Sequence, residues 1–199
     1  MRKHISYLTV LFALTLTGLF ASACAAYPVP TATAPVPGIP GSVVPTTPTQ
    51  GKPDWFGIAL EDSQTGETFT MNDFAGKVVL VQTFAEWCST CAYQENEVRD
   101  MANALGNPAG LVLVSLDTDL SEDKASLKKY ADYFDFGWRF VVSPLEVSRA
   151  LGNLYSVEYL NPPLEPMLII DRHGQVYGLP NGFKNANQLK NTIAQYLQK

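Results

Sequence analysis

The chain has 199 residues and a formal net charge of −5. This acidic balance, without clusters of Lys or Arg in the body of the chain, argues against nucleic acid as a partner. Composition divides the chain near residue 53. The first part holds an apolar run and a proline-rich stretch, whereas residues 54–199 hold nearly all the charge and all three tryptophans. The second part is long enough for one domain and too short for two ordinary ones.

Residues 1–24 are typical of an export signal. A basic start and an apolar segment over residues 5–20 precede the small residues Ala21-Ser22-Ala23-Cys24. This tetrapeptide is similar to a bacterial lipobox, in which Cys24 carries lipid, although an aliphatic residue usually stands in place of Ala21. The alternatives are an ordinary A-x-A cleavage site or an uncleaved anchor helix. Each interpretation places the domain outside the cytoplasm, and we favour a membrane-attached lipoprotein.

Residues 25–53 predict a disordered linker. No charged residue occurs between Ala25 and Gly51, and seven prolines recur there among Thr, Ala, Val and Gly. Such a segment cannot bury enough apolar area to offset the entropy of ordering it. Proline favours extended states, so the linker could reach up to ~80 Å and hold the domain away from a membrane.

The domain begins with a predicted hairpin, formed by residues 56–60 and 67–70 around a Ser-Gln-Thr-Gly turn. Residues 78–84 are an apolar, β-branched run, which is typical of a central strand buried on both faces. A Ser cap, a Pro and a Glu at 143–146 favour a helix start at Ser143.

Periodicity predicts further helices over residues 89–105, 121–134 and 185–198, and further strands over 111–116, 139–142, 166–171 and 175–177. The strand–helix–strand–helix order, followed by a hairpin and a helix, indicates an α/β fold with a mixed sheet flanked by helices.

The motif that carries chemistry is Cys88-Ser89-Thr90-Cys91, directly after the buried strand and at the start of a helix. The unpaired N–H groups of a helix start favour a thiolate at Cys88. Two intervening residues bring both sulfurs onto one turn. The Cys88 thiolate can therefore attack a partner disulfide, and Cys91 can resolve the mixed disulfide that forms.

Two other interpretations of this motif are weaker. Zinc needs two more ligands, and the domain offers only His173 besides these cysteines. A purely structural disulfide stabilises little when it closes so short a loop. No metal or other cofactor is expected.

The sequence resembles the TlpA/ResA family of extracytoplasmic thioredoxin-like proteins, within the AhpC/TSA-redoxin superfamily. The resemblance lies in residues 73–81 and 84–91 and extends through 167–174. It implies a thioredoxin-like fold over residues 54–199, with Cys88 as nucleophile and Cys91 as resolving cysteine.

The same resemblance implies roles for three further residues. Pro166 matches a cis-proline that faces the disulfide, and Glu165 before it would offer its backbone to a bound substrate. Trp87 is expected to pack beside the disulfide and limit its exposure.

The departures from the family concern the surroundings of the cysteines. Thr90 stands where many relatives have Pro, and Gln94 and Asn96 replace a Glu and a Pro. Gln82 replaces a buried Asp of thioredoxin that assists proton transfer. A neutral amide cannot act as a base, so deprotonation of Cys91 needs water or another carboxylate. Glu86 is nearest in sequence, but a solvated surface role is favoured for it.

Four acidic residues, Asp117, Asp119, Glu122 and Asp123, lie before and at the start of the predicted second helix. Helix capping and the helix dipole explain them better than a cation site does. His173 is interpreted as a turn residue.

Three functions compete. The favoured one is a thiol–disulfide oxidoreductase that reduces disulfides of exported proteins, with cytochrome c maturation or a similar process implied by the family, and with a redox partner protein. The second is copper delivery of the SCO type, but SCO proteins space their cysteines CxxxC and have a histidine where Leu164-Glu165-Pro166 stands. The third is a peroxiredoxin-like peroxidase, which would need a Thr where Ala85 stands.

Overall fold

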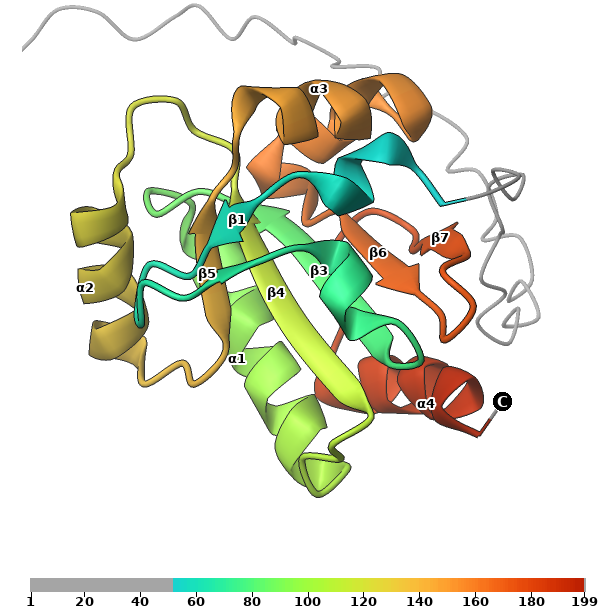
Figure 1. The fold of residues 1–199 in the computed structure, drawn as a ribbon. Coiled ribbons are helices and arrows are strands. Elements are labelled where there is room, and N and C mark those ends of the chain that lie inside the picture. The colour runs from blue at the N-terminus through green and yellow to red at the C-terminus, as the bar shows by residue number, and fades with distance from the viewer. Residues whose placement is uncertain (1–51, 199) are drawn as a thin grey trace, which may run out of the picture. The chain divides into compact units, whose positions relative to one another are not determined.

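The computed structural model describes residues 52–198, whose centre is a five-stranded sheet of order β5-β4-β3-β6-β7 (Figure 1). The strands are β3 (Val78–Phe84), β4 (Leu111–Asp117), β5 (Arg139–Val142), β6 (Met167–Ile170) and β7 (Val176–Gly178). β3, β4 and β5 run parallel, whereas β6 and β7 pair antiparallel. All of β3 is buried, as the apolar run over residues 78–84 predicted.

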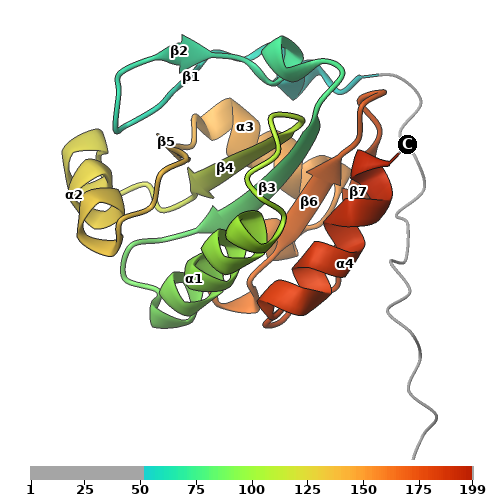
Figure 2. The ribbon, with the colours of Figure 1, turned by 90° about the horizontal axis from the view of Figure 1, so that it is seen from below.

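Four helices flank this sheet: α1 (Ser89–Ala104), α2 (Lys124–Phe134), α3 (Leu145–Leu154) and α4 (Ala186–Leu197). Figure 2 shows α1 and α4 side by side below the sheet, with α3 and a small hairpin of β1 (Leu60–Glu61) and β2 (Thr68–Phe69) above it. α2 packs beside β5. The thioredoxin-like α/β fold and the N-terminal hairpin are therefore confirmed.

The core has a layer on each face of the sheet. On one face, alternate β3 residues such as Val79 and Val81 pack with the hairpin segment and α3. On the other, Val78 and Leu80 pack with α1 and α4. A third cluster surrounds the end of β3, where Phe84 meets both cysteines and the aromatic residues of α2 and β5. The cysteines thus belong to the core rather than to an exposed loop.

The hairpin is shorter than predicted, because residues 54–57 form a 3₁₀ turn. Trp55 and Phe56 are adjacent in sequence, and both are buried in the same cluster. Successive side chains of a strand point to opposite faces, so only a turn can bury both on one side.

Ser143 does not cap α3, which begins at Leu145 after Pro144. The Ser143 N–H donates to the carbonyl of Asp117 and so prolongs the pairing of β5 with β4. Its hydroxyl oxygen accepts from the Ser148 hydroxyl at 2.9 Å instead of capping the helix. α2 also starts later than predicted, with Asp123 as its N-cap.

The expected leader, the linker and Cys24 lie outside the described residues. None of the helices within residues 52–198 has the length and apolar character needed to cross a bilayer.

α4 begins with a capping box that can be tested. The Asn185 side chain accepts from the Gln188 N–H at 3.0 Å, and the Gln188 side chain accepts from the Asn185 N–H at 2.9 Å. Asn185→Ala is expected to lower the free energy of unfolding by about 1 kcal/mol. Asn191→Ala, at an exposed position inside the same helix, should lower it by much less. Urea unfolding of both variants checks this, and equal losses would contradict the capping role.

Candidate active site

The two cysteines lie where the central strand passes into a helix. β3 ends at Phe84, a short loop follows, and α1 begins at Ser89 with Cys88 as its N-cap. β3 is hydrogen-bonded to β4 on one side and to β6 on the other. Cys88 therefore lies just beyond the carboxyl end of the central strand, in the strand–cysteine–helix order that the sequence predicted.

Cys88 and Cys91 are joined by a disulfide, with their Cα atoms 5.2 Å apart. Both are buried, but Cys88 retains 3 % of its surface and Cys91 none. An incoming thiolate can therefore reach only the sulfur of Cys88. This asymmetry fits an attacking first cysteine and a resolving second one.

The surroundings of the Cys88 sulfur favour negative charge. The backbone N–H of Cys91 donates to Cys88 Sγ at 3.2 Å, and Thr90 Oγ1 lies 3.4 Å from the same sulfur. Both contacts come from the first turn of α1, where the helix dipole also favours an anion. Thr90 thus offers a hydroxyl that the proline of many relatives cannot.

The expectation of a cis-Pro166 is wrong, since no peptide bond within residues 52–198 is cis. Glu165 adopts a left-handed conformation (φ 51°, ψ 50°) after the 3₁₀ turn Pro162–Leu164. Its N–H donates to the carbonyl of Pro162 at 2.8 Å. This tight turn directs the chain into β6 with a trans bond before Pro166.

The Glu165 backbone was expected to bind a substrate, but its carbonyl already accepts a hydrogen bond from within the chain. The Lys184 Nζ donates to the Glu165 carbonyl at 2.8 Å and to the Gly182 carbonyl at 2.5 Å. Burial lowers the pKa of Lys184 to about 8. Gln94, at the position of the family's Glu, binds the Lys184 backbone through both ends of its amide. Sequence spacing alone could not have predicted this contact, because its partners lie 90 residues apart.

A groove of about 370 Å³ lies beside the disulfide. Its lining residues are Thr90, Tyr93, Asn96, Glu97, Glu165 and Phe183. Tyr93 and Phe183 are 69 % and 54 % exposed, so their rings give the groove an apolar surface that a bound chain could cover. The groove starts at Thr90, between the two cysteines, so a polypeptide bound there would lie next to the reactive bond.

Trp87 and the acidic residues form the other flank of the site. The Trp87 ring is 61 % exposed, and its Nε1 donates to Asp119 Oδ2 at 2.7 Å. Glu122 accepts the Glu86 N–H through both carboxylate oxygens. Burial raises the pKa of Glu86, which is partly buried rather than solvated as expected. That Trp87 shields the disulfide stays a prediction.

The remaining predicted polar residues have structural roles. The Asp123 side chain accepts the N–H groups of Ala125 and Ser126, which confirms it as a cap. The His173 N–H donates to Asp171 in the predicted turn. In the part of the chain that the structure describes, no three His, Cys, Asp or Glu side chains group as a metal site requires.

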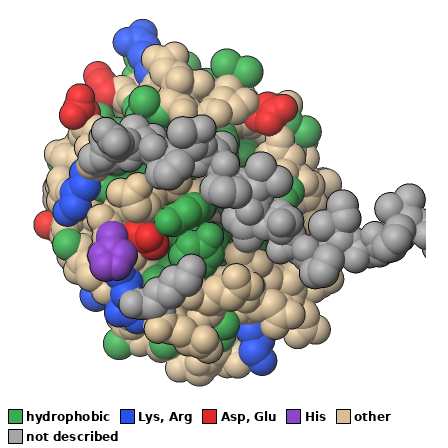
Figure 3. All heavy atoms as spheres, turned by 90° about the vertical axis from the view of Figure 1, so that its right-hand side faces the viewer, with side chains coloured by type: hydrophobic (Ala, Val, Ile, Leu, Met, Phe, Trp, Pro, Cys, Tyr) green, Lys and Arg blue, Asp and Glu red, His purple; other side chains and the backbone are tan. Residues whose placement is uncertain are grey.

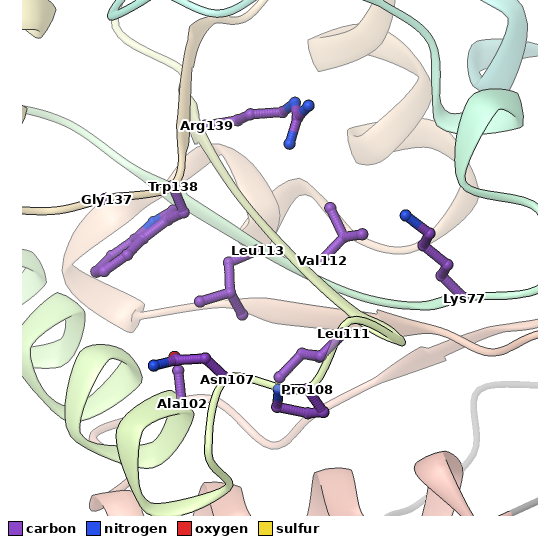
Figure 4. A pocket seen from close by; sticks show the side chains of 10 residues that line it. All are labelled: Lys77, Ala102, Asn107, Pro108, Leu111, Val112, Leu113, Gly137, Trp138 and Arg139. Carbon is purple, nitrogen blue, oxygen red and sulfur yellow. The ribbon is translucent and has the colours of Figure 1, made fainter.

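A second pocket has a volume of about 270 Å³, and Figure 4 shows the side chains that line it. It is lined by Leu111, Val112 and Leu113 at the start of β4, whereas Cys88 follows the carboxyl end of the parallel strand β3. Among the described side chains on the face in Figure 3, basic and acidic groups are scattered rather than gathered by sign. Neither feature competes with the disulfide as the site.

The sequence did not single out Glu95, which lies one turn after Cys91 on α1 and is fully buried. Burial raises its pKa to about 8, and the nearby Ser115 hydroxyl offsets part of the shift. Neither carboxyl oxygen has a hydrogen-bond partner of good geometry. The i, i+4 spacing from Cys91 within the predicted helix was the available indication.

The family profile described as Redoxin matches residues 28–196. No protein of curated function matches the chain.

Several solved structures share the fold. A thiol:disulfide interchange protein of Chlorobium tepidum has 19 % identity and a TM-score of 0.57, covering 70 % of this chain and 92 % of its own. A secreted disulfide oxidoreductase of Mycobacterium tuberculosis has 12 % identity and a TM-score of 0.57, covering 71 % and 98 %. Copper-bound yeast Sco1 has 19 % identity and a TM-score of 0.58, covering 75 % and 96 %. At these identities the likeness concerns the fold alone.

The raised pKa of Glu95 predicts a pH-dependent stability of the disulfide form. Below about pH 4.5 the carboxyl is protonated in both folded and unfolded chains, so it contributes no pH dependence. Between pH 4.5 and about 8 only the unfolded chain ionises, and stability falls as pH rises, by up to about 1.4 kcal/mol per pH unit. Glu95→Gln should remove this slope.

Urea unfolding of the oxidised protein at pH 5 and pH 7.5 measures the effect. Burial also raises the pKa of Asp117, so this residue adds a pH dependence of the same sign in both wild type and Glu95→Gln. The difference between the two slopes therefore reports Glu95 alone. Glu146→Gln, at an exposed position on α3, serves as control and should leave the slope unchanged. Identical slopes in Glu95→Gln and wild type would contradict the prediction.

Proposed function

The chain belongs to the Redoxin family, and we propose that its thiol–disulfide oxidoreductase activity reduces disulfides of exported proteins outside the cytoplasm. The observation that carries the proposal is the Cys88–Cys91 disulfide at the first turn of α1, beside an open apolar groove. A structural disulfide would need neither an anion-stabilising helix start nor an adjoining groove.

The chemistry follows from the contacts of the two sulfurs. In the dithiol form, the Cys88 thiolate is stabilised by the Cys91 N–H and the Thr90 hydroxyl. It attacks one sulfur of a substrate disulfide, forms a mixed disulfide and releases the other substrate sulfur as a thiolate. Cys91 then loses its proton and attacks Cys88 Sγ, which releases the second substrate thiolate. The substrate gains two electrons, and the enzyme ends as the disulfide.

An extracytoplasmic location is part of the proposal. It is supported by the export-signal pattern over residues 1–24 and by the secreted relative of Mycobacterium tuberculosis. Attachment to a membrane through Cys24, cytochrome c maturation as the process and a redox partner that re-reduces the disulfide belong to the same proposal.

The exchange mechanism predicts which single-cysteine variant traps a substrate. Cys91→Ser keeps the attacking sulfur and lacks the resolving one, so it should accumulate a mixed disulfide with insulin. Cys88→Ser should form far less, because Cys91 is fully buried. Non-reducing electrophoresis and mass spectrometry of both variants detect the adduct. No adduct with Cys91→Ser, or equal amounts of adduct with both variants, would overturn the proposed function. In a separate titration, tight 1:1 copper(I) binding without disulfide exchange would favour copper delivery instead.

The groove predicts a difference between large and small substrates. Phe183→Ala should raise the KM for insulin by about tenfold, the effect of losing one aromatic contact of roughly 1.4 kcal/mol. Turnover of oxidised glutathione, which is too small to span the groove, should be unchanged. Tyr133→Ala, which removes an exposed aromatic ring from α2, is the matched control. A loss that is equal for both substrates would show that Phe183 acts on the disulfide rather than on a bound chain.

A further inference from the structure

Exchange at a buried resolving cysteine requires a place for one proton. Cys91 has no exposed surface, and its sulfur must release a proton when the disulfide forms and take one when it breaks. Gln82, on β3 beneath the motif, is a neutral amide and cannot supply or accept that proton. The proton must therefore pass to another group inside the domain or to water that enters it.

Glu95 lies where such a group is needed. It follows Cys91 by four residues on α1, so both side chains project from the same face of the helix. Both are fully buried. Arg99, one turn further along, does not neutralise the carboxyl, because its guanidinium contacts Asp100, the Phe134 carbonyl and the Phe136 ring.

Three neighbouring elements contribute uncharged polar groups near Glu95. Gln82 of β3 and Ser115 of β4 are register partners on the face that α1 covers. Trp138 Nε1 donates to Ser115 Oγ at 2.9 Å. Tyr130 of α2 is titratable and interacts with Glu86 and Glu122 as well as with Glu95. Burial raises its pKa further above its usual value, so its hydroxyl stays protonated.

This polar layer is incompletely hydrogen-bonded. Both amide atoms of Gln82 and the Tyr130 hydroxyl have no hydrogen-bond partner in the structure. The carboxyl oxygens of Glu95 have none of good geometry either, although the Ser115 hydroxyl lies close enough to affect its pKa. Buried polar atoms without partners are rare and usually have a reason, such as an unseen water or a role in chemistry. A carboxyl that exchanges a proton must not have both oxygens permanently occupied, so these vacant positions suit proton transfer.

We propose that Glu95 is the proton donor and acceptor for Cys91, directly or through one water. This inference rests on the exchange chemistry of the proposed function but not on the identity of its substrates. In the disulfide form Glu95 holds the proton. When a thiolate attacks Cys88 Sγ, the Cys88–Cys91 bond breaks, Cys91 leaves with the electron pair and the Glu95 proton moves to Cys91. The products are a mixed disulfide at Cys88, a Cys91 thiol and a Glu95 carboxylate.

The return step is the same reaction in reverse. The Glu95 carboxylate takes the proton of the Cys91 thiol, and the Cys91 sulfur attacks Cys88 Sγ of the mixed disulfide. The substrate leaves as a thiolate, and Glu95 is again protonated. No further oxidant or reductant is needed.

Other carboxyls near the site are partly engaged elsewhere, although Asp117 Oδ2 and Glu86 Oε1 are also buried without a hydrogen-bond partner. Glu122 accepts the Glu86 N–H, and Asp117 Oδ1 accepts the Asp119 N–H at 2.9 Å. Asp117 is nevertheless buried at the end of β4, and burial together with Glu122 raises its pKa. Asp117 is therefore the strongest competitor for the role and provides the matched control.

The test compares rates of reduction of the full-length oxidised protein by dithiothreitol between pH 6 and pH 9.5. The ratio of the wild-type rate to the Glu95→Gln rate cancels the titration of the reagent. We expect a ratio of about 100 at pH 6–7, the lower end of general acid catalysis. It should fall towards one above pH 9, where Glu95 has lost its proton. Asp117→Asn should keep the wild-type rates across this range.

A ratio that does not change with pH would show only structural damage and overturn the proposal, as would a pH-dependent loss in Asp117→Asn. A second measurement needs no folded variant. The infrared spectrum of the wild-type disulfide form should show a protonated carboxyl band at pH 7 that is lost by pH 9.5, and its absence at pH 7 would contradict the proposal. The rate measurement uses dithiothreitol instead of a protein substrate. A negative result would therefore reject the role of Glu95 without affecting the proposed function, which insulin trapping by Cys91→Ser tests separately.

Discussion

The donation of the Cys91 N–H to Cys88 Sγ is the contact on which the rest of the site depends. It exists only because a fully buried strand ends at Phe84 and places Cys88 before the first turn of α1. The charge of a thiolate there is balanced by peptide groups that the helix leaves unpaired, so no cationic side chain is required. The sheet, by fixing this junction, determines which sulfur reacts and which one is protected.

Local patterns predicted this junction, because it uses only neighbouring residues. The run of residues 78–84, the CxxC spacing and the following helix are each visible in a short window. The conformation opposite the cysteines was not predictable in the same way. The Pro166 bond is trans, Glu165 turns back on Pro162, and Lys184 holds the Glu165 carbonyl from 19 residues away. A match to a family motif cannot report such a contact, since the motif contains only one of its partners.

The polar layer beneath the cysteines is a second feature that local sequence patterns did not predict. Gln82 leaves the resolving cysteine without an acid, and proximity in sequence is the simplest criterion for a replacement. Glu86 satisfied that criterion, but it lies in the loop against Glu122. Glu95 satisfies the spatial criterion, because helical periodicity turns it under the sheet. The acid is thus supplied by the helix instead of the strand, and a search along the helix face would have found it.

The groove beside Thr90 has a kinetic consequence. Its exposed walls are aromatic, its carboxylates belong to Glu97 and Glu165, and no Lys or Arg is among the described residues that line it. Such a surface gives little long-range attraction to draw in a partner, so encounters depend on diffusion and on short-range apolar contact. Association with a neutral partner should then be slow and depend little on ionic strength. Chains that are already unfolded around an accessible disulfide would react first, and folded proteins with shielded disulfides would be spared.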